Sequence, residues 1–545
     1  MKHFNYKILF FIFIIFIFAT VVRSFFLADI PPSLYSDEIN QGYNAYSILL
    51  SGKDEHGIFL PISFRSFGDW KPPLPTYLMI PSIFLFGLNE FAVRLPSVIL
   101  GIGSIFITFF LTKELFSSNR LALLSSFFLS ISPWHILQSR SAMLVIVALF
   151  FFELGIYFFI KGVKNNKLFI LSFIFFAFSI YSYYGMRVIT PLMILFLIIF
   201  YRKDAIYIRK WFIFASFFSL LILTPLLLAF LKEPDVILGR ARTVSIFYDQ
   251  GVKLRQWELI TQDGLNTSPL ISRFFHNNVY MYVRNFLQRL LSHFDWNYLF
   301  FIGDKSPPFQ IPEMGILYLA DSIFLLVGLI NLLQNKNREK FIIIFWIIFS
   351  LVPAALTFMT PSSNRTFNEV VPLVIFIAFG VTRINRLKYT QIISLSICFI
   401  YIFSFGYFLN QYFYNLKINH ADYWNYGWKE VVNYVNSVAY KYDQIEVADV
   451  GMPYIYFLFY NQYDPIKYQN EAIRTYVSDQ FGYEHVEGFD KYFFQINFNW
   501  KYAKENMRSK TLYIIPNLEA ENDNNFIKII NYPNGKIAYK IFSNE

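Results

Sequence analysis

The run ILFFIFIIFIFATVVRSFFL at Ile8–Leu27 is the first of eleven apolar stretches that decide the fold. Many of these stretches approach the roughly 20 residues that a helix needs to cross a bilayer core. The chain has 545 residues, 55% of them hydrophobic and 21% aromatic, which is too apolar for a soluble enzyme. We therefore expect an all-α polytopic membrane protein with about 11 transmembrane helices. The other ten stretches are Phe91–Leu111, Leu121–Trp134, Met143–Ile160, Leu168–Tyr184, Val188–Tyr201, Trp211–Leu231, Gly315–Leu333, Phe341–Met359, Phe367–Val381 and Ile392–Leu409.

The basic residues between the apolar stretches predict the orientation in the membrane. Clusters of Lys and Arg occupy every second connection, whereas the short loops between them carry single arginines, Arg140, Arg187 and Arg365. The positive-inside rule then places the N-terminus in the cytoplasm. Because the net charge of +10 lies largely in these clusters, it does not indicate nucleic-acid binding. The clusters are Lys2 and Lys7; Lys113 and Arg120; Lys161, Lys164 and Lys167; Arg202, Lys203, Arg209 and Lys210; Lys336, Arg338 and Lys340; Arg383, Arg386 and Lys388.

Three long segments are then expected outside the membrane. They are residues 28–90, residues 232–314 and the tail, residues 410–545. Within the first, Leu74–Leu88 is apolar, but counting it as a crossing would invert every later loop, so we interpret it as an interfacial or re-entrant helix. In the tail, Gln444–Val450 and Thr511–Ile515 are typical of strands, and Trp428–Val438 has a helical pattern. We expect residues 1–409 to form the membrane module and residues 410–545 a small extracytoplasmic α/β domain that folds alone.

The first external loop carries the residues best placed for chemistry. Asp37 and Glu38 stand side by side before an amphipathic stretch, Ile39–Leu50. Adjacent carboxylates at the start of a helix suit base catalysis or a divalent metal, and they are equally typical of ordinary helix capping. Further along, Lys71 precedes two prolines that stiffen the backbone. Such a lysine suits a phosphate ligand, although it could also extend toward lipid headgroups.

Together these motifs resemble the first loop of glycosyltransferase family 39. That family includes dolichyl-phosphate-mannose protein mannosyltransferases and bacterial aminoarabinose transferases of lipid A, all with the multi-span GT-C fold. The similarity is clearest over roughly the first two hundred residues. The motifs that carry it are Asp37-Glu38, Asp54-Glu55, Phe67–Leu74, Arg94–Ser97, Ser132–His135 and Ser139-Arg140, with Arg187, Pro191, Pro353–Thr357 and Arg365 as later landmarks.

The resemblance implies roles for particular residues. Asp37 matches the catalytic base or organiser of the acceptor site, with Glu38 beside it, and both would hold a divalent metal if one binds. Lys71 matches the position that neutralises the donor phosphate, and Asp69 and Trp70 would contact substrate. By placement more than by motif, Arg140, Arg187 and Arg365 are further phosphate ligands. The resemblance implies no other cofactor.

Two departures from the family pattern bear on the metal and the donor. Bacterial relatives often have an acidic residue shortly after the Ser-Arg pair, where this chain has Ser141–Val145. A histidine commonly precedes the arginine of the late loop, where this chain has Pro361–Asn364. A catalytically divergent family member is therefore an open alternative.

The expected function is a membrane-embedded glycosyltransferase at the extracytoplasmic face of the plasma or inner membrane. It would move a hexosyl or pentosyl group from a polyprenyl phosphate to a hydroxyl of a protein, lipid or glycan acceptor, with inversion. The departing phosphate needs a cation, and the attacking hydroxyl needs a base. A lipid or glycan transporter or flippase is the rival class. The chain has no GxxxxGK[ST] loop, and its hydropathy shows no half-to-half symmetry.

Overall fold

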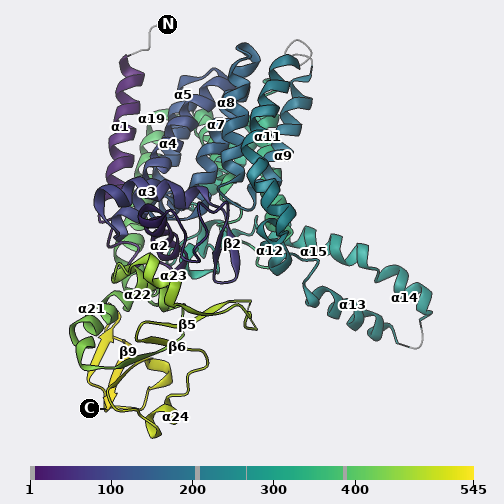
Figure 1. Ribbon diagram of the computed structural model, residues 1–545. Helices are drawn as coiled ribbons and strands as arrows, with labels where there is room; N and C mark the ends of the chain where they lie inside the picture. Colours follow the sequence, from purple (N-terminus) through teal and green to yellow (C-terminus); the bar gives the residue numbers. More distant parts are fainter. Residues whose placement is uncertain (1–5, 203–208, 265–266, 385–388, 481, 545) are drawn as a thin grey trace. The chain divides into compact units, whose positions relative to one another are not determined.

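The computed structural model describes residues 6–202, 209–264, 267–384, 389–480 and 482–544, and Lys2, Lys203, Arg386 and Lys388 lie outside them. The chain divides into two compact units, each assembled from distant segments (Figure 1). The first unit contains Met1–Val21, Leu100–Gln138 and Leu144–Phe408. The second contains Val22–Ile99, Ser139–Met143 and Leu409–Glu545.

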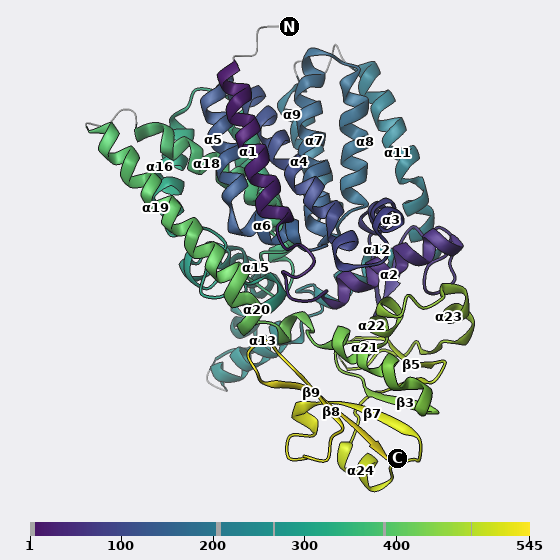
Figure 2. The same cartoon turned by 90° about the vertical axis from the view of Figure 1, so that its left-hand side faces the viewer.

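The first unit is built from apolar helices, as predicted. Each of the eleven stretches contains a helix, and α4, α7, α8 and α11 run side by side (Figures 1 and 2). By length and composition five helices of the described chain can cross a membrane, or six if α5 and α6, bent by 59°, form one span. The count of eleven spans stays a prediction. The helices are α1 (Tyr6–Ser24), α4 (Glu90–Phe116), α5 (Asn119–Ile131), α6 (Pro133–Arg140), α7 (Leu144–Lys164), α8 (Leu168–Ile180), α9 (Met186–Phe200), α11 (Arg209–Lys232), α16 (Asp321–Gln334), α17 (Lys340–Ala355), α18 (Val370–Arg383) and α19 (Thr390–Asn410).

Small residues let these helices pack closely. A Cβ atom on Gly328 of α16 would lie 1.8 Å from the carbonyl oxygen of Phe376 in α18. A Cβ atom on Gly380 of α18 would lie 2.3 Å from the carbonyl oxygen of Phe324 in α16. Because both partners approach through glycine, the two backbones touch directly, which is the packing mode favoured between apolar helices in lipid.

Residues 232–314, predicted as an external loop, carry four more helices of the first unit. They are α12 (Asp235–Val244), α13 (Gln250–Asp263), α14 (Pro269–Phe275) and α15 (Asn278–Ser292). The last three stand away from α9 and α11 of the same unit (Figure 1).

The second unit joins the first external loop to the tail. The loop supplies α2 (Ser36–Ser51), the hairpin β1 (Phe64–Ser66) and β2 (Asp69–Lys71), and α3 (Leu74–Phe86). The tail forms a seven-stranded sheet of order β4-β5-β6-β3-β7-β9-β8, in which β3 pairs parallel with β6 and β7 and the other pairs are antiparallel. Its strands are β3 (Gln444–Ala448), β4 (Ile473–Thr475), β5 (His485–Phe489), β6 (Tyr492–Gln495), β7 (Thr511–Pro516), β8 (Lys528–Asn531) and β9 (Ile537–Asn544). Its helices are α20 (Leu416–Asn419), α21 (Trp428–Val438), α22 (Tyr454–Tyr460), α23 (Pro465–Glu471) and α24 (Trp500–Glu505). The predicted α/β character of the tail is confirmed.

One hydrophobic core serves both the loop and the tail. Ile39 and Tyr43 of α2 and Phe457 and Phe459 of α22 are all buried within it, and Figure 2 shows α2 beside α22 and α23. Gly42 permits this contact, because a Cβ atom there would lie 2.6 Å from Val93 and 3.0 Å from Phe459. The independent folding of residues 410–545 stays a prediction, and the shared core provides its test.

We expect Ile39→Ala, in the first loop, to destabilise the tail. Ile39 is fully buried, and a buried Ile→Ala change typically costs about 2–5 kcal/mol. Leu50→Ala on the same helix is the control, because Leu50 is 57% exposed. The measurement is the temperature at which a protease begins to cut the tail of the whole protein. An unchanged temperature for Ile39→Ala would show that the tail folds as an independent domain.

Candidate active site

The two neighbouring carboxylates of the first loop have different surroundings. They lie in the first turn of α2, where successive side chains point about 100° apart around the axis. The side chain of Asp37 is 44% exposed, whereas that of Glu38 is fully buried. Their adjacency in sequence therefore does not place them in one reactive group.

Glu38 ties three segments of the second unit together. Its Oε1 accepts from Arg94 Nε at 3.2 Å and from the Ala142 amide at 2.7 Å. Its Oε2 accepts from the Tyr35 amide at 2.9 Å and from Arg94 Nη2 at 3.4 Å. These four contacts use both carboxylate oxygens, and Arg94 is itself fully buried. The pair joins α2 to α4 and to the segment Ser139–Met143.

Lys71 is brought to Asp37 by the β1–β2 hairpin. Phe67 and Gly68 form its two-residue turn with φ of 54° and 85°, the left-handed geometry that suits the twist of a hairpin. Lys71 pairs with Phe64 across the hairpin, and its Nζ lies 2.5 Å from Asp37 Oδ1. Lys71 is almost fully buried, so its accessible partner is the half-exposed carboxylate of Asp37.

Asp69 and Trp70 lie on the same hairpin and are half-buried. Asp69 Oδ1 accepts from the Trp70 amide at 2.9 Å. The guanidinium of Arg65 lies 5.9 Å from the centre of the Trp70 ring. The hairpin thus presents a carboxylate, an indole and the Lys71 ammonium within a few residues.

The tail holds this hairpin through a clamp, which we define as the pair Arg65–Glu484 together with the packing of Gly68 against Gly482. Arg65 donates to Glu484 through Nε at 2.9 Å and Nη2 at 2.5 Å, and its guanidinium lies 4.6 Å from the centre of the Tyr476 ring. Gly68 packs so closely that a Cβ atom there would lie 2.8 Å from the carbonyl oxygen of Gly482. A bidentate Arg–carboxylate pair fixes orientation as well as distance.

The clamping segment of the tail is itself tied to the sheet. His485, at the start of β5, lies between Asp449 and Asp479, with Nδ1 2.6 Å and Nε2 3.3 Å from their carboxylates. The hydrogen bond to Asp449 raises the pKa of His485. The imidazole of His485 therefore bridges the end of β3 and the loop that carries Glu484.

The second acidic pair of the loop, Asp54 and Glu55, is buried, and its hydrogen-bond partners belong to the second unit. Glu55 Oε1 accepts from Asn40 at 2.7 Å and Asn44 at 3.0 Å, and its Oε2 accepts from Tyr454 of the tail at 3.3 Å. Asp54 accepts from the Ile58 amide at 2.9 Å, and burial raises the pKa of Asp54. Sequence reasoning missed the two asparagines, although their spacing of four residues on a helix is a usable signal.

Three arginines are predicted phosphate ligands because of their positions in external loops. In the structure each of them donates hydrogen bonds to main-chain carbonyls. Arg140 belongs to the second unit, is fully buried, and donates to Val22 at 2.8 Å, Phe25 at 2.7 Å and Ile30 at 3.0 Å. In the first unit, Arg187 donates to Val236 at 3.1 Å and Ile237 at 3.2 Å. Arg365 donates to the Met359 carbonyl at 2.8 Å and to the Thr357 hydroxyl.

The loop that carries Arg365 is supported by polar groups that sequence reasoning missed. Asp304 accepts from the amide and hydroxyl of Ser363 at 2.6 and 2.8 Å, and burial raises the pKa of Asp304. Burial lowers the pKa of His293 to about 4, and its Nε2 accepts from the Ser362 amide at 3.2 Å. Arg289 donates to the Thr357 carbonyl at 2.6 Å.

Asp37 and Glu38 do not fit the divalent metal that the resemblance allowed. Both oxygens of Glu38 are occupied by Arg94 and two amides, and Asp37 is paired with Lys71. A metal would have to displace a buried guanidinium, which is costly. Within the described ranges, no group of three or more His, Cys, Asp or Glu residues could hold a metal ion.

The fold is similar to that of solved GT-C glycosyltransferases. ArnT from Cupriavidus metallidurans bound to undecaprenyl phosphate superposes with a TM-score of 0.58 at 11% identity, covering 98% of each chain. Its apo form gives 0.54 at 10% identity, covering 98% of this chain and 97% of that one. The Archaeoglobus fulgidus oligosaccharyltransferase tethered with an acceptor peptide gives 0.53 at 11% identity, covering 98% of this chain and 74% of that one.

A family model also matches part of the sequence. Residues 70–228 match the family described as dolichyl-phosphate-mannose-protein mannosyltransferase. No curated protein sequence gives a significant match. The predicted family resemblance is confirmed by this match together with the fold, although the matched region begins at Trp70 and does not include Asp37 and Glu38.

We expect Glu38→Ala to lower the stability of the fold. The change would leave Arg94 buried without its carboxylate, and breaking a buried pair in this way typically costs about 3–5 kcal/mol. Asp37→Ala is the matched neighbour and should cost much less, because its carboxylate is half exposed. Thermal unfolding of the purified variants measures the difference. A Glu38→Ala protein with normal stability and no transferase activity would instead make Glu38 catalytic.

Proposed function

We propose that this protein transfers a sugar from a polyprenyl-phosphate donor to an acceptor hydroxyl at the extracytoplasmic face of the cell membrane, with inversion. The observation that carries the proposal is the pair of Asp37 and Lys71, a half-exposed carboxylate against a nearly buried ammonium. Undecaprenyl phosphate on ArnT and an acceptor peptide on the oligosaccharyltransferase, both of the same fold, support this substrate class.

The two residues divide the chemistry between them. Asp37 takes the proton of the attacking hydroxyl, because its half-exposed carboxylate lies beside the Lys71 ammonium. Lys71 neutralises the phosphate that departs from the anomeric carbon. A bound donor phosphate competes with Asp37 for the Lys71 ammonium, so donor binding makes the carboxylate more available as a base. The site is thereby completed only when the donor is present.

The remaining residues act around this pair. Asp69 and Trp70 contact the sugar or the acceptor from the same hairpin. Arg187 and Arg365 are proposed ligands of the donor phosphate. Glu38 and Arg140 are reassigned as positioning residues, because their polar atoms are committed to Arg94 and to main-chain carbonyls.

The proposed topology follows the alternation of basic clusters. The chain crosses the membrane about 11 times with its N-terminus in the cytoplasm. Residues 28–90, residues 232–314 and residues 410–545 then lie outside. This arrangement keeps the hairpin and its clamp in the tail on the same side of the membrane.

We expect Asp37→Asn to reduce transfer by about 10²-fold or more, the usual loss when a general base is removed. Donor binding should not weaken, and it should tighten to the extent that the phosphate has to displace Asp37 from Lys71, since the neutral amide keeps the shape but no longer competes for the ammonium. The assay supplies radiolabelled polyprenyl-phosphate sugars to membranes that contain the protein. Asp29→Asn is the control, because Asp29 is an exposed acid of the same loop.

Lys71→Ala should weaken donor binding and slow transfer together, since one charge serves both the ground state and the leaving group. Lys53→Ala, an exposed lysine of the same loop, is its control.

Near wild-type transfer by Asp37→Asn, at equal protein level, would show that the assigned base is incorrect.

We expect charge reversal at the clamp to move the hairpin. Arg65→Glu or Glu484→Arg alone should raise the donor KM, because Lys71 lies six residues beyond Arg65 on the same hairpin. The double variant restores an ion pair and should recover much of the loss, as coupled neighbours do. Steady-state kinetics on all three variants provides the measurement. If the effects of the two single variants on donor KM add in the double variant, the ion pair is not the contact through which the tail positions the hairpin.

A further inference from the structure

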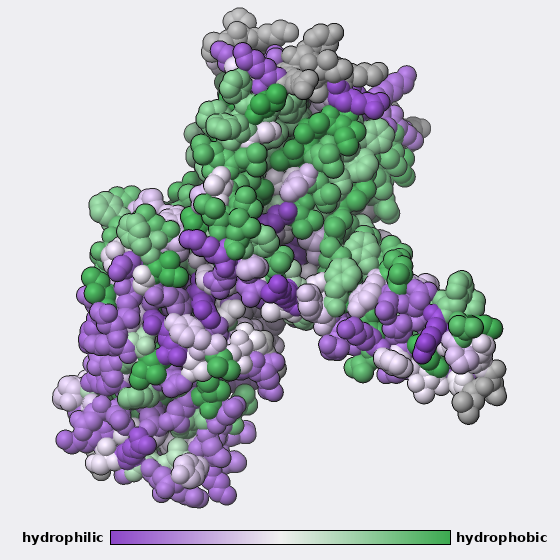
Figure 3. All heavy atoms as spheres, turned by 45° about the vertical axis from the view of Figure 1, so that its right-hand side comes forward, coloured by the Kyte–Doolittle hydropathy of each residue, from purple (hydrophilic) through white to green (hydrophobic). Residues whose placement is uncertain are grey.

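The helices α13, α14 and α15 form an arm on the first unit. The chain enters it from α11, a helix long and apolar enough to cross a membrane, which ends at Lys232. Only two residues separate that end from α12 at Asp235. Because α11 spans the bilayer in the proposed topology, α12, which leads into the arm, starts at the membrane surface. Figure 3 shows hydrophobic and hydrophilic atoms side by side on it.

The apolar side of α15 is exposed rather than packed. Val279, Tyr280, Val283, Leu287 and Leu291 are between 49% and 73% exposed. Their spacing places them within about a third of the helix circumference. On the other side, Met281 is buried and α15 contacts α13 and α17.

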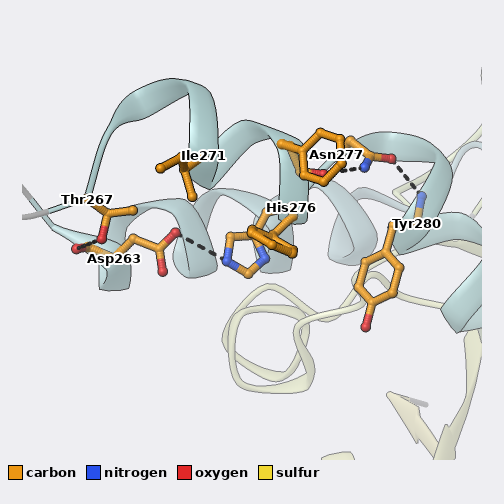
Figure 4. A pocket seen from close by; sticks show the side chains of 8 residues that line it. Asp263, Thr267, Ile271, His276, Asn277 and Tyr280 are labelled. Carbon is orange, nitrogen blue, oxygen red and sulfur yellow. Dashed lines mark hydrogen bonds and ion pairs between the residues drawn. The ribbon is translucent and has the colours of Figure 1, made fainter.

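The other two helices of the arm add to this surface. Trp257 of α13 is 65% exposed, and Leu270 and Phe274 of α14 are 81% and 73% exposed. Asp263 links α13 to α14, since its Oδ2 accepts from Ser272 at 2.5 Å and lies 3.3 Å from His276 Nε2 (Figure 4). Together with Tyr280 of α15, these helices line a hollow of about 630 Å³. Exposed apolar surface on this scale indicates an interaction site.

The flanking charges identify what covers the surface. Exposed cations accompany the apolar residues on each helix, Lys253 on α13, Arg273 on α14 and Arg284 on α15. Apolar and aromatic residues on one side with Lys and Arg beside them are the pattern of helices that lie in a membrane interface. Cations on all three helices match anionic headgroups, and the exposed acid of α13, Glu258, is paired with Arg255 of the same helix.

We propose that the α13–α15 arm lies in the headgroup region of the bilayer, with the stripe Val279, Tyr280, Val283, Leu287 and Leu291 in the acyl boundary and the cations on anionic lipids. The arm then anchors residues 232–314 at the membrane surface independently of catalysis. Sugar transfer is not needed for this contact, so the proposal can be tested apart from the function.

The test places one fluorophore on each side of α15. In a Cys398→Ser background, single cysteines replace Leu287, on the stripe, or Gln288, its exposed polar neighbour. Each is labelled with bimane, and the whole protein is reconstituted into vesicles with or without brominated acyl chains. Bromolipid quenching should be about twofold or more stronger at position 287 than at 288. Vesicles of phosphatidylcholine alone should give weaker quenching than vesicles that contain phosphatidylglycerol.

Two outcomes would overturn the proposal. Equal, weak quenching at both positions would place the stripe in water or against protein. Energy transfer between labels at position 287 on different molecules, falling as lipid is added, would identify a second copy of the chain as the partner. A variant with Val283 and Leu287 both changed to Asp should lower quenching of a label at Tyr280, which checks that the whole stripe inserts.

Discussion

The arrangement of the second unit depends on one buried ion pair, Glu38 with Arg94. In a low-dielectric interior neither charge is tolerated alone, so each determines where the other must lie. Arg94 also donates to the carbonyls of Leu27, Pro31 and Ser33, at 3.1, 2.9 and 2.5 Å. The start of α2 is therefore held from two directions. Asp37 precedes Glu38 on the same turn, so the pair that buries Glu38 also directs Asp37 toward the accessible side.

The position of Lys71 depends on a second, longer chain of contacts. The hairpin turn at Phe67 and Gly68 aligns Lys71 with Phe64, and the pair of Arg65 with Glu484 fixes the hairpin to the tail. Through this link a residue near the end of the sequence sets the position of a cation near its start. The shared core of α2 and α22 places the same two segments together by an independent, apolar contact. Ionic and apolar contacts therefore agree on one geometry, and such agreement favours a single native state.

Sequence patterns predict the parts of this structure that depend on local physics. Each apolar stretch contains a helix because backbone groups in an apolar setting must bond within their own segment. The strands β3 and β7 and the helix α21 appear where short-range patterns place them. The ion pairs escape prediction, because Asp37 meets Lys71 across 34 residues and Arg65 meets Glu484 across 419. The helices α12–α15 lie in a segment between apolar stretches, where no long apolar run marks a helix.

The distinction between Glu38 and Asp37, or between Arg140 and Lys71, also lies beyond sequence spacing. It rests on which polar atoms the fold satisfies internally. Arg94 and Arg140 are planar, multi-donor groups, and carbonyl oxygens of the irregular segment between α1 and α2 accept hydrogen bonds from them. These bonds satisfy carbonyl oxygens of a segment that is buried in part, at Leu27, Ile30 and Pro31. A lysine presents its donors from one nitrogen, without the planar fork of a guanidinium. Lys71 instead faces one half-exposed carboxylate, and a cation held by one accessible partner is the kind that an incoming phosphate can take over.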